Sequence, residues 1–212
     1  MALPQEKLLY TVEQYLAMER AAEERHNYID GYVIKLAGES LAHSTINVNL
    51  LRIISTQLLG KPCRALSPNM KVKSGPVFEA RKSRQGIFSY ADVSVVCGTP
   101  EFHDELRDVL TNPTVIIEIL SDSTAGYDLD QKFRRYRAQL TSLQDYVLVE
   151  QKVPWIRLYS RQANNWIFTD AAGLEETLYL PSIECRLPLR EVYDRVEFAE
   201  LDEDDADETP ES

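Results

Sequence analysis

Two acidic residues lie in segments that otherwise have the composition of buried strands. Glu118 is the only charged residue in segment 115–120, and Asp92 is the only charged residue in segment 90–97. Burial of an unpaired carboxylate costs several kcal/mol, so such groups are normally paired, protonated or bound to a metal ion. Because both acids have the same setting, the sequence predicts that they share one cation, for which carboxylate oxygens are suitable ligands.

Lys132 adds a third group with a chemical role. It lies four residues after Asp128 and four residues before Tyr136, so all three line one side of a predicted helix. A surface salt bridge to Asp128, worth at most about 1 kcal/mol, would explain Lys132 by itself. Combined with the two strand acids, Lys132 indicates a metal-dependent phosphodiesterase, in which acids bind the cation and the ammonium group orients water or stabilises the transition-state charge.

His43, at the start of a long apolar pattern, is a further candidate. Histidine titrates near neutral pH, so this side chain could act as a general base or contact a scissile phosphate. A partly buried hydrogen-bonding role is the alternative, and the sequence leaves both open. Ser121 directly follows the Glu118 segment, where it belongs either to a cap and loop or to the groups that hydrogen-bond the metal ligands.

The pattern around these residues predicts an α/β chain of short elements. Helices are expected from Thr11, with a capping box, to about Arg25, from about Ser40 to Leu59, from about Asp128 with an apolar face of Leu129, Phe133, Tyr136 and Leu140, and near residues 191–195. Strands are expected as a pair within 28–36 that turns at Asp30-Gly31, then at 63–72, 90–97, 115–120, 145–150, 155–159, 165–169 and 175–180. The order strand, helix, strand from 115 to 150 predicts a right-handed crossover. The last three strands predict an antiparallel extension.

Length, composition and charge are compatible with one domain. The chain has 212 residues, of which 44% are hydrophobic, and we predict one domain over residues 1–198 and a disordered acidic tail over residues 199–212. A net charge of −11 would repel a polyanion at long range. Residues 200–212 contain eight acidic and no basic side chains. The predicted domain is therefore nearly balanced in charge, and DNA is not excluded as a partner.

The cysteine pattern and the absence of long apolar stretches predict where in the cell the protein resides. Cys63, Cys97 and Cys185 are far apart in the sequence and form neither a CxxC pair nor an even disulfide set, which favours the reducing cytoplasm. The N-terminus lacks the basic and then apolar pattern of a signal peptide, and no apolar stretch approaches the ~20 residues that span a bilayer. We therefore expect no membrane association.

A series of weak motifs runs along most of the chain. In order, they are 28–31, His43, 90–96, 114–124, Tyr127-Asp128, Lys132, Tyr136 and 146–149. In this order and combination the chain resembles the Uma-type family of restriction endonucleases in the PD-(D/E)XK nuclease superfamily. The resemblance implies a restriction-endonuclease-like α/β core, with a central mixed β-sheet flanked by helices and a C-terminal antiparallel extension.

The resemblance also implies the parts of an active site. Asp92 and Glu118 are expected to bind Mg²⁺, with Mn²⁺ as an alternative ion, and the backbone carbonyl of Ile119 to complete the protein ligands. The lysine expected just after the glutamate is absent, since Leu120 holds its place, and Lys132 resembles a migrated equivalent. DNA is the implied substrate, and a homodimer is expected because cutting both strands favours two-fold symmetry.

Two positions depart from the family pattern. Asn27 stands where a glutamate usually precedes the aromatic-Ile-Asp-Gly motif, and Ala91 stands where a proline usually precedes the aspartate. Ala91 can adopt the same extended conformation. Asn27 can still coordinate through its carbonyl oxygen but contributes no charge. The leading hypothesis is thus a magnesium-dependent endonuclease, and the alternative is a catalytically degenerate nuclease fold that binds DNA or protein.

Overall fold

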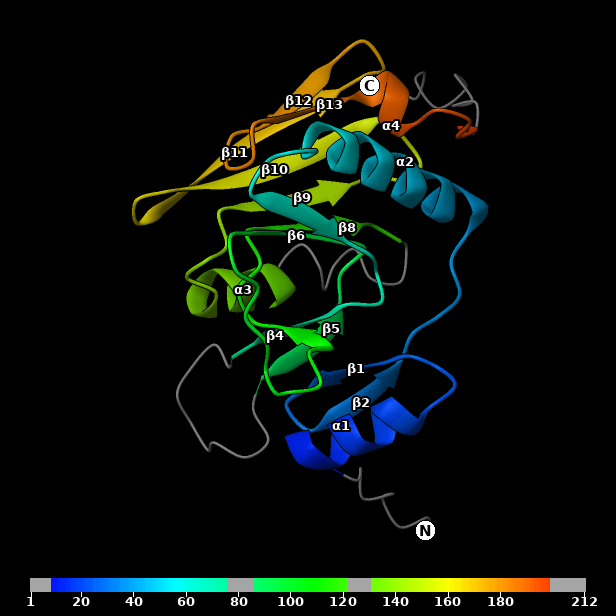
Figure 1. The fold of residues 1–212 in the computed structure, drawn as a ribbon. Helices are drawn as coiled ribbons and strands as arrows, with labels where there is room; N and C mark the ends of the chain where they lie inside the picture. Colours follow the sequence, from blue (N-terminus) through cyan, green and yellow to red (C-terminus); the bar gives the residue numbers. More distant parts are fainter. Residues whose placement is uncertain (1–8, 76–85, 122–130, 199–212) are drawn as a thin grey trace, which may run out of the picture.

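The computed structural model describes residues 9–75, 86–121 and 131–198, which form a mixed α/β fold (Figure 1). The helices are α1 Val12–Ala21, α2 Leu41–Gln57, α3 Phe133–Gln139 and α4 Leu189–Val192. The strands are β1 His26–Ile29, β2 Tyr32–Lys35, β3 Cys63–Leu66, β4 Lys71–Ser74, β5 Ile87–Tyr90, β6 Val93–Cys97, β7 Val109–Leu110, β8 Val115–Ile119, β9 Asp145–Val149, β10 Trp155–Gln162, β11 Asn165–Ala172, β12 Thr177–Leu180 and β13 Cys185–Pro188. The predicted acidic tail, Asp128 and Leu129 lie outside the described residues.

The central sheet has six strands in the order β11-β10-β9-β8-β6-β3. β8 and β9 are parallel, and the other neighbouring pairs are antiparallel. α3 lies between β8 and β9 in the chain, so the predicted strand, helix, strand crossover is confirmed. All five residues of β8 are buried, which explains its nearly continuous run of β-branched side chains.

Helices cover both faces of this sheet. Val115, Ile117 and Ile119 of β8 face a core shared with α2 and α4, whereas Ile116 faces a second core shared with Phe133 of α3. This alternation follows from the two-residue period of a strand. The helical face predicted for the third helix is confirmed, because Phe133, Tyr136 and Leu140 are all buried.

A second sheet has the strand order β2-β1-β5-β4-β7 and lies on the α1 side of the molecule (Figure 1). Two strands predicted as continuous are divided between the sheets. Segment 90–97 breaks at Ala91 and Asp92, so that β5 belongs to one sheet and β6 to the other. Segment 63–72 breaks at a turn in which the Met70 N–H donates to Ser67 O over 3.1 Å. Asp92 therefore lies at a junction between sheets, not inside a strand.

Local signals at the N-terminus are confirmed. Thr11 and Gln14 form the capping box of α1, although this helix ends at Ala21 and not near Arg25. The β1–β2 hairpin turns at Asp30 and Gly31, with φ angles of 49° and 98°. Two successive left-handed residues are the requirement of a type I′ turn, which the Asp-Gly dipeptide meets.

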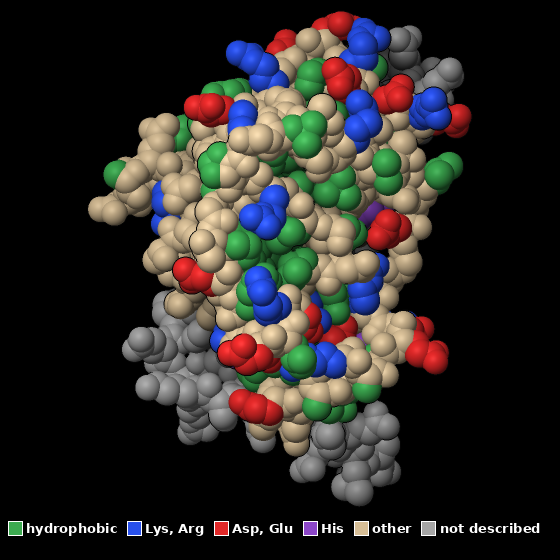
Figure 2. Space-filling view, in the orientation of Figure 1, with side chains coloured by type: hydrophobic (Ala, Val, Ile, Leu, Met, Phe, Trp, Pro, Cys, Tyr) green, Lys and Arg blue, Asp and Glu red, His purple; other side chains and the backbone are tan. Residues whose placement is uncertain are grey.

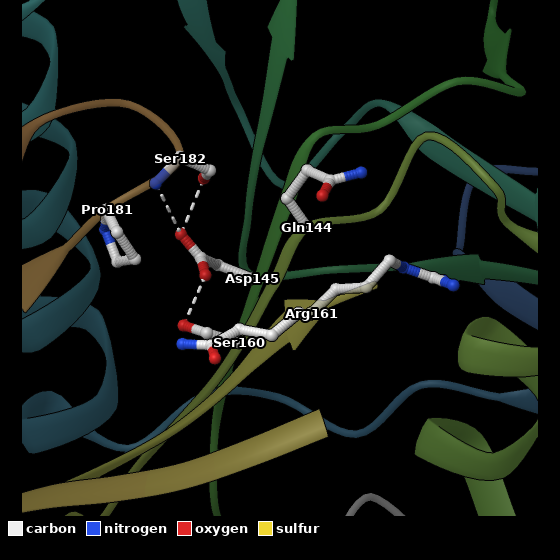
Figure 3. A pocket seen from close by; sticks show the side chains of 7 residues that line it. Gln144, Asp145, Ser160, Arg161, Pro181 and Ser182 are labelled. Atoms are coloured by element: carbon white, nitrogen blue, oxygen red, sulfur yellow. Dashed lines mark hydrogen bonds between the residues drawn. The ribbon is translucent and has the colours of Figure 1, made fainter. Parts of the chain in front are cut away.

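The predicted C-terminal antiparallel extension is also confirmed, in the β10–β11 hairpin and the β12–β13 pair. Asp145, at the start of β9, is hydrogen-bonded to Ser160 of β10 and to Ser182, which follows β12 (Figure 3). Its carboxylate accepts hydrogen bonds from Ser160 Oγ at 2.6 Å, Ser182 Oγ at 2.5 Å and Ser182 N at 3.2 Å. These donors compensate the burial of Asp145 beside a cavity of about 310 Å³.

None of the described helices is long and apolar enough to cross a membrane.

The cysteine prediction was wrong for two of the three residues. Antiparallel pairing of β3 and β6 places Cys63 opposite Cys97, and the two form a disulfide. Spacing in the sequence carried no sign of this pairing, because the sheet register brings together residues that are 34 positions apart. Cys185 is a buried free thiol.

Replacing Cys63 with Ser should lower the free energy of unfolding of the oxidised protein by about 4 kcal/mol. The reason is the loop-closure entropy that a cross-link of this span removes from the unfolded chain. Urea unfolding of wild type and variant measures the difference. A reductant should weaken the wild type by a similar amount and leave the variant unchanged; equal unfolding midpoints of the two oxidised proteins would contradict the expectation.

Candidate functional site

Three strand ends meet at one edge of the central sheet. The parallel strands β8 and β9 end there, at Ile119 and Val149, while the antiparallel neighbour β6 begins there at Val93. The carboxyl ends of strands are common positions for binding sites in α/β sheets. Asp92 and Glu118, the two acids singled out in the sequence, both lie at this edge.

Asp92 is held by one side chain and one backbone group. His43, in the first turn of α2, places Nε2 2.9 Å from Asp92 Oδ1, and the Ile119 N–H donates to Asp92 Oδ2 over 2.6 Å. The Asn47 side chain donates to the backbone oxygen of Asp92 over 3.1 Å. With its side chain 18% exposed, Asp92 is less buried than predicted. Asp92 therefore contacts both of the predicted site residues His43 and Ile119.

Glu118 lies deeper, next to Lys132. Lys132 Nζ is 2.8 Å from Glu118 Oε1, and the two side chains are only 5% and 4% exposed. Glu118 is two residues after Ile116 and shares its face of β8, the face that α3 covers, and Lys132 directly precedes that helix. Lys132 thus forms a buried ion pair with Glu118, whereas Asp128, the partner suggested by the sequence, lies outside the described residues.

The sheet register relates the two acids. β6 and β8 are antiparallel, and their pairing ends with Val93 opposite Ile117. Asp92, one residue before β6, contacts β8 through the Ile119 N–H, and Glu118 is the residue before Ile119. Within residues 9–75, 86–121 and 131–198, no three His, Cys, Asp or Glu side chains are grouped to hold a metal ion.

The remaining predicted residues have other surroundings. Asn27 Oδ1 accepts the backbone N–H of Tyr90 over 3.1 Å, which ties β1 to the strand leading to Asp92. Tyr136 is fully buried, and its hydroxyl lies 2.6 Å from Ser89 Oγ. Ser121 is half-buried just after β8, and Asp128 lies outside the described part of the chain.

Gln151, just beyond β9, was missed in the sequence. Its Nε2 donates to the Leu120 carbonyl over 2.6 Å and lies 3.4 Å from His43 Nδ1, and its Oε1 accepts from Ser40 Oγ over 2.7 Å. A glutamine among polar residues after a strand has no compositional contrast, so only the parallel register of β8 and β9 could have indicated its position.

Another buried acid, Glu19, was also missed, because α1 is rich in charged residues. Tyr90 OH donates to Glu19 Oε1 over 2.7 Å, and His26 Nδ1 lies 3.0 Å from Glu19 Oε2. Burial, followed by the hydrogen bond to Glu19, raises the pKa of the Tyr90 hydroxyl. The phenol therefore stays protonated and continues to donate at neutral pH. This network anchors α1 to β5, two residues before Asp92.

The face of the molecule in Figure 2 carries interspersed basic and acidic side chains. No continuous basic patch dominates the described residues visible there. Long-range attraction of a polyanion is therefore weak on this face, and local groups must supply the binding energy of any anionic ligand.

Replacing Lys132 with Met should lower the free energy of unfolding by about 3–5 kcal/mol, because Glu118 would lose the cation beside it in a buried setting. The exposed pair Lys35–Glu24, with side chains 60% and 59% exposed, provides the matched control. Lys35→Met should cost at most about 1 kcal/mol. Chemical denaturation of both variants measures the contrast, and equal costs would show that burial does not set the strength of the Lys132 pair.

Comparison with known proteins identifies the family of this chain. A model of Uma2, described as "Putative restriction endonuclease", matches residues 12–190. The uncharacterized protein sll1609 of Synechocystis sp. is 30% identical over 166 residues, which cover 78% of this chain and 89% of that protein. The uncharacterized protein slr1290 of the same organism is 29% identical over 187 residues, covering 88% and 92%.

One solved structure has a similar fold. It is described as "a putative nuclease belonging to DUF820" from Anabaena variabilis, and it matches with a TM-score of 0.68 and 17% identity. The match covers 87% of this chain and 97% of that one. At this identity the match shows a common fold, and the predicted restriction-endonuclease-like core is confirmed. With the family match extending from α1 to α4, the chain belongs to the Uma2 family.

Proposed function

We propose that the protein is a metal-dependent endonuclease that hydrolyses phosphodiester bonds of DNA, with Asp92 and Glu118 as metal ligands. The observation that carries this proposal is that Glu118, paired with the buried Lys132, and Asp92, one residue before β6, lie at the same end of the adjacent strands β8 and β6. The family description and the name of the solved structure support it. The proposal includes action on DNA in the cytoplasm and a homodimer, in which two sites would cut the two strands.

The donor set suits Mg²⁺, or Mn²⁺ in its place. Both side chains offer hard carboxylate oxygens, and the Ile119 peptide lies against Asp92, so its carbonyl is available as a further oxygen ligand. Mg²⁺ usually binds through one or two carboxylates and keeps several waters. The described residues offer no cluster of three His, Cys, Asp or Glu side chains, which fits Mg²⁺ better than zinc, whose protein sites use three or four such ligands.

Each residue has a distinct role in this reaction. When bound, the metal ion supplies Lewis-acid stabilisation of charge on the phosphate. Lys132, held by Glu118, presents its ammonium group from the α3 side, where it orients the attacking water and stabilises the charge that develops on phosphorus-bound oxygens. His43 acts through Asp92, because its Nε2 contacts the carboxylate of that residue.

A non-cleaving nuclease fold that binds DNA or protein is the alternative function. Asn27 favours it, because this side chain has no charge and one lone pair of its Oδ1 accepts the Tyr90 N–H. A charged ligand at this position is therefore missing, and the site has to work with Asp92 and Glu118. Absence of DNA cleavage by the wild-type protein, with DNA binding retained, would support this alternative.

Asp92→Ala and Lys132→Ala should each reduce Mg²⁺-dependent plasmid cleavage by about 100-fold or more, because each removes several kcal/mol of transition-state stabilisation. Glu23→Gln, at an exposed position of the α1 side, is the control and should cleave at the wild-type rate. The measurement is the initial rate of nicking and linearisation. Equal cleavage by wild type and both alanine variants would identify a contaminating nuclease and contradict the proposal.

Mg²⁺ should also stabilise the wild-type protein, by about 2.7 kcal/mol at one hundred times its dissociation constant. Glu118→Gln should abolish this response, because the amide carries no charge to attract the cation. Without metal the variant should also unfold more easily than wild type, since Lys132 would lose its counter-charge. Thermal unfolding with and without Mg²⁺ measures both effects. A wild-type protein that does not respond to Mg²⁺ or Mn²⁺ would remove the basis of the shared-cation site.

A further inference from the structure

Gln151 connects three segments that converge on the candidate site. The residue follows β9, contacts the end of β8 through the Leu120 carbonyl, and contacts the start of α2 through Ser40 and His43. Ser40 is itself the N-cap of α2, where its Oγ accepts the His43 N–H over 3.0 Å. One side chain thus joins the helix that carries His43 to the strand that carries Glu118.

The contacts of Gln151 determine how its amide is oriented. The Leu120 carbonyl can only accept a hydrogen bond, so the group 2.6 Å from it must be the amide NH₂. The opposite orientation would place two oxygens at that distance. Ser40 Oγ can donate, and it therefore faces the amide oxygen at 2.7 Å. The orientation of the amide follows from its neighbours.

The Gln151 amide and the Asp92 carboxylate agree on which ring nitrogen of a neutral His43 carries the proton. The same NH₂ group lies 3.4 Å from His43 Nδ1, so Nδ1 faces it with a lone pair. In a neutral imidazole the proton is then on Nε2. Nε2–H points at Asp92 Oδ1 over 2.9 Å, and a hydrogen bond to this carboxylate results. In the other tautomer, the lone pairs of His43 Nε2 and Asp92 Oδ1 would face each other over 2.9 Å.

We propose that Gln151 is a positioning residue for Asp92, acting through the placement of the His43 ring. The role rests on the proposed function, because it matters for catalysis only if Asp92 binds a metal ion. Asp92 has two N–H donors, one on each oxygen: His43 Nε2 and the Ile119 backbone. Together they set the rotation of the carboxylate, and Gln151 secures the donor that is not part of the sheet. Groups that orient metal ligands typically contribute 10–100-fold to metal affinity or activity.

The tautomer is tested by NMR on metal-free protein at about pH 8, where histidine is ordinarily neutral. Nitrogen-15 shifts of the His43 ring in wild type should show a protonated Nε2 and an unprotonated Nδ1. Gln151→Leu should keep this tautomer, because Asp92 still accepts from Nε2. Gln151→Glu has the same length but presents only acceptors, so an acceptor would face each ring nitrogen and both nitrogens should be protonated. Wild-type shifts in Gln151→Glu would overturn the contact of Gln151 with Nδ1 on which the proposal rests.

The consequence for Asp92 is tested by the dissociation constant for Mn²⁺, measured by electron paramagnetic resonance. Gln151→Leu should weaken binding about 10-fold or more. Gln144, which precedes β9 at the opposite end of the same strand, is the matched control, and Gln144→Leu should bind Mn²⁺ like wild type. Unchanged affinity in Gln151→Leu would overturn the positioning role. Failure of the wild type to bind Mn²⁺ would contradict the proposed function instead, while the NMR result would still decide the tautomer.

Discussion

The ion pair between Glu118 and Lys132 is the interaction on which the candidate site depends. A carboxylate in a strand that is covered on both faces needs a cation close by, and neither neighbouring strand, β6 or β9, carries a basic side chain. The cation has to come from the element that covers that face, which is α3. The parallel crossover from β8 to β9 passes through this helix. The connection that makes the two strands parallel therefore also brings Lys132 to Glu118. The buried face of α3 then follows from the need to hold Lys132 at the end of β8.

Asp92 satisfies a different physical requirement. It is partly exposed, lies where two sheets divide, and is held by hydrogen bonds from His43 and from the Ile119 peptide. The two acids therefore differ in character: Glu118 has a lysine counter-charge, whereas Asp92 has N–H donors on both oxygens and access to solvent. Such a difference suits a site in which Asp92 is accessible to an incoming ligand while Glu118 stays beside the Lys132 ammonium group.

The sequence predicts the parts of this fold whose signals are local. The capping box at Thr11, the Asp30-Gly31 turn and the apolar face of α3 each depend on residues within one or two turns of chain, and the structure contains all three. Long-range pairing was harder to predict. A continuous β-branched run from Val93 to Cys97 joins smoothly to Tyr90, and nothing in its composition reveals that the backbone changes sheets at Asp92.

The same limit applies to the site. Glu118 and Asp92 stood out because charge contrasts with their apolar neighbours, and Lys132 stood out through its helical spacing. Gln151, Glu19 and the partnership of Cys63 with Cys97 have no such contrast, since each depends on which strands lie side by side. Register converts distant positions into neighbours, and a single sequence contains little information about register.

The division at Ala91 and Asp92 has a mechanical consequence. β5 and β6 are successive parts of one backbone that belong to different sheets, and Asp92 is the residue at which they separate. A small rotation of one sheet against the other would turn the peptide of Asp92 while Glu118, in the middle of the central sheet, stayed still. The separation of the two carboxylates therefore depends on the angle between the sheets.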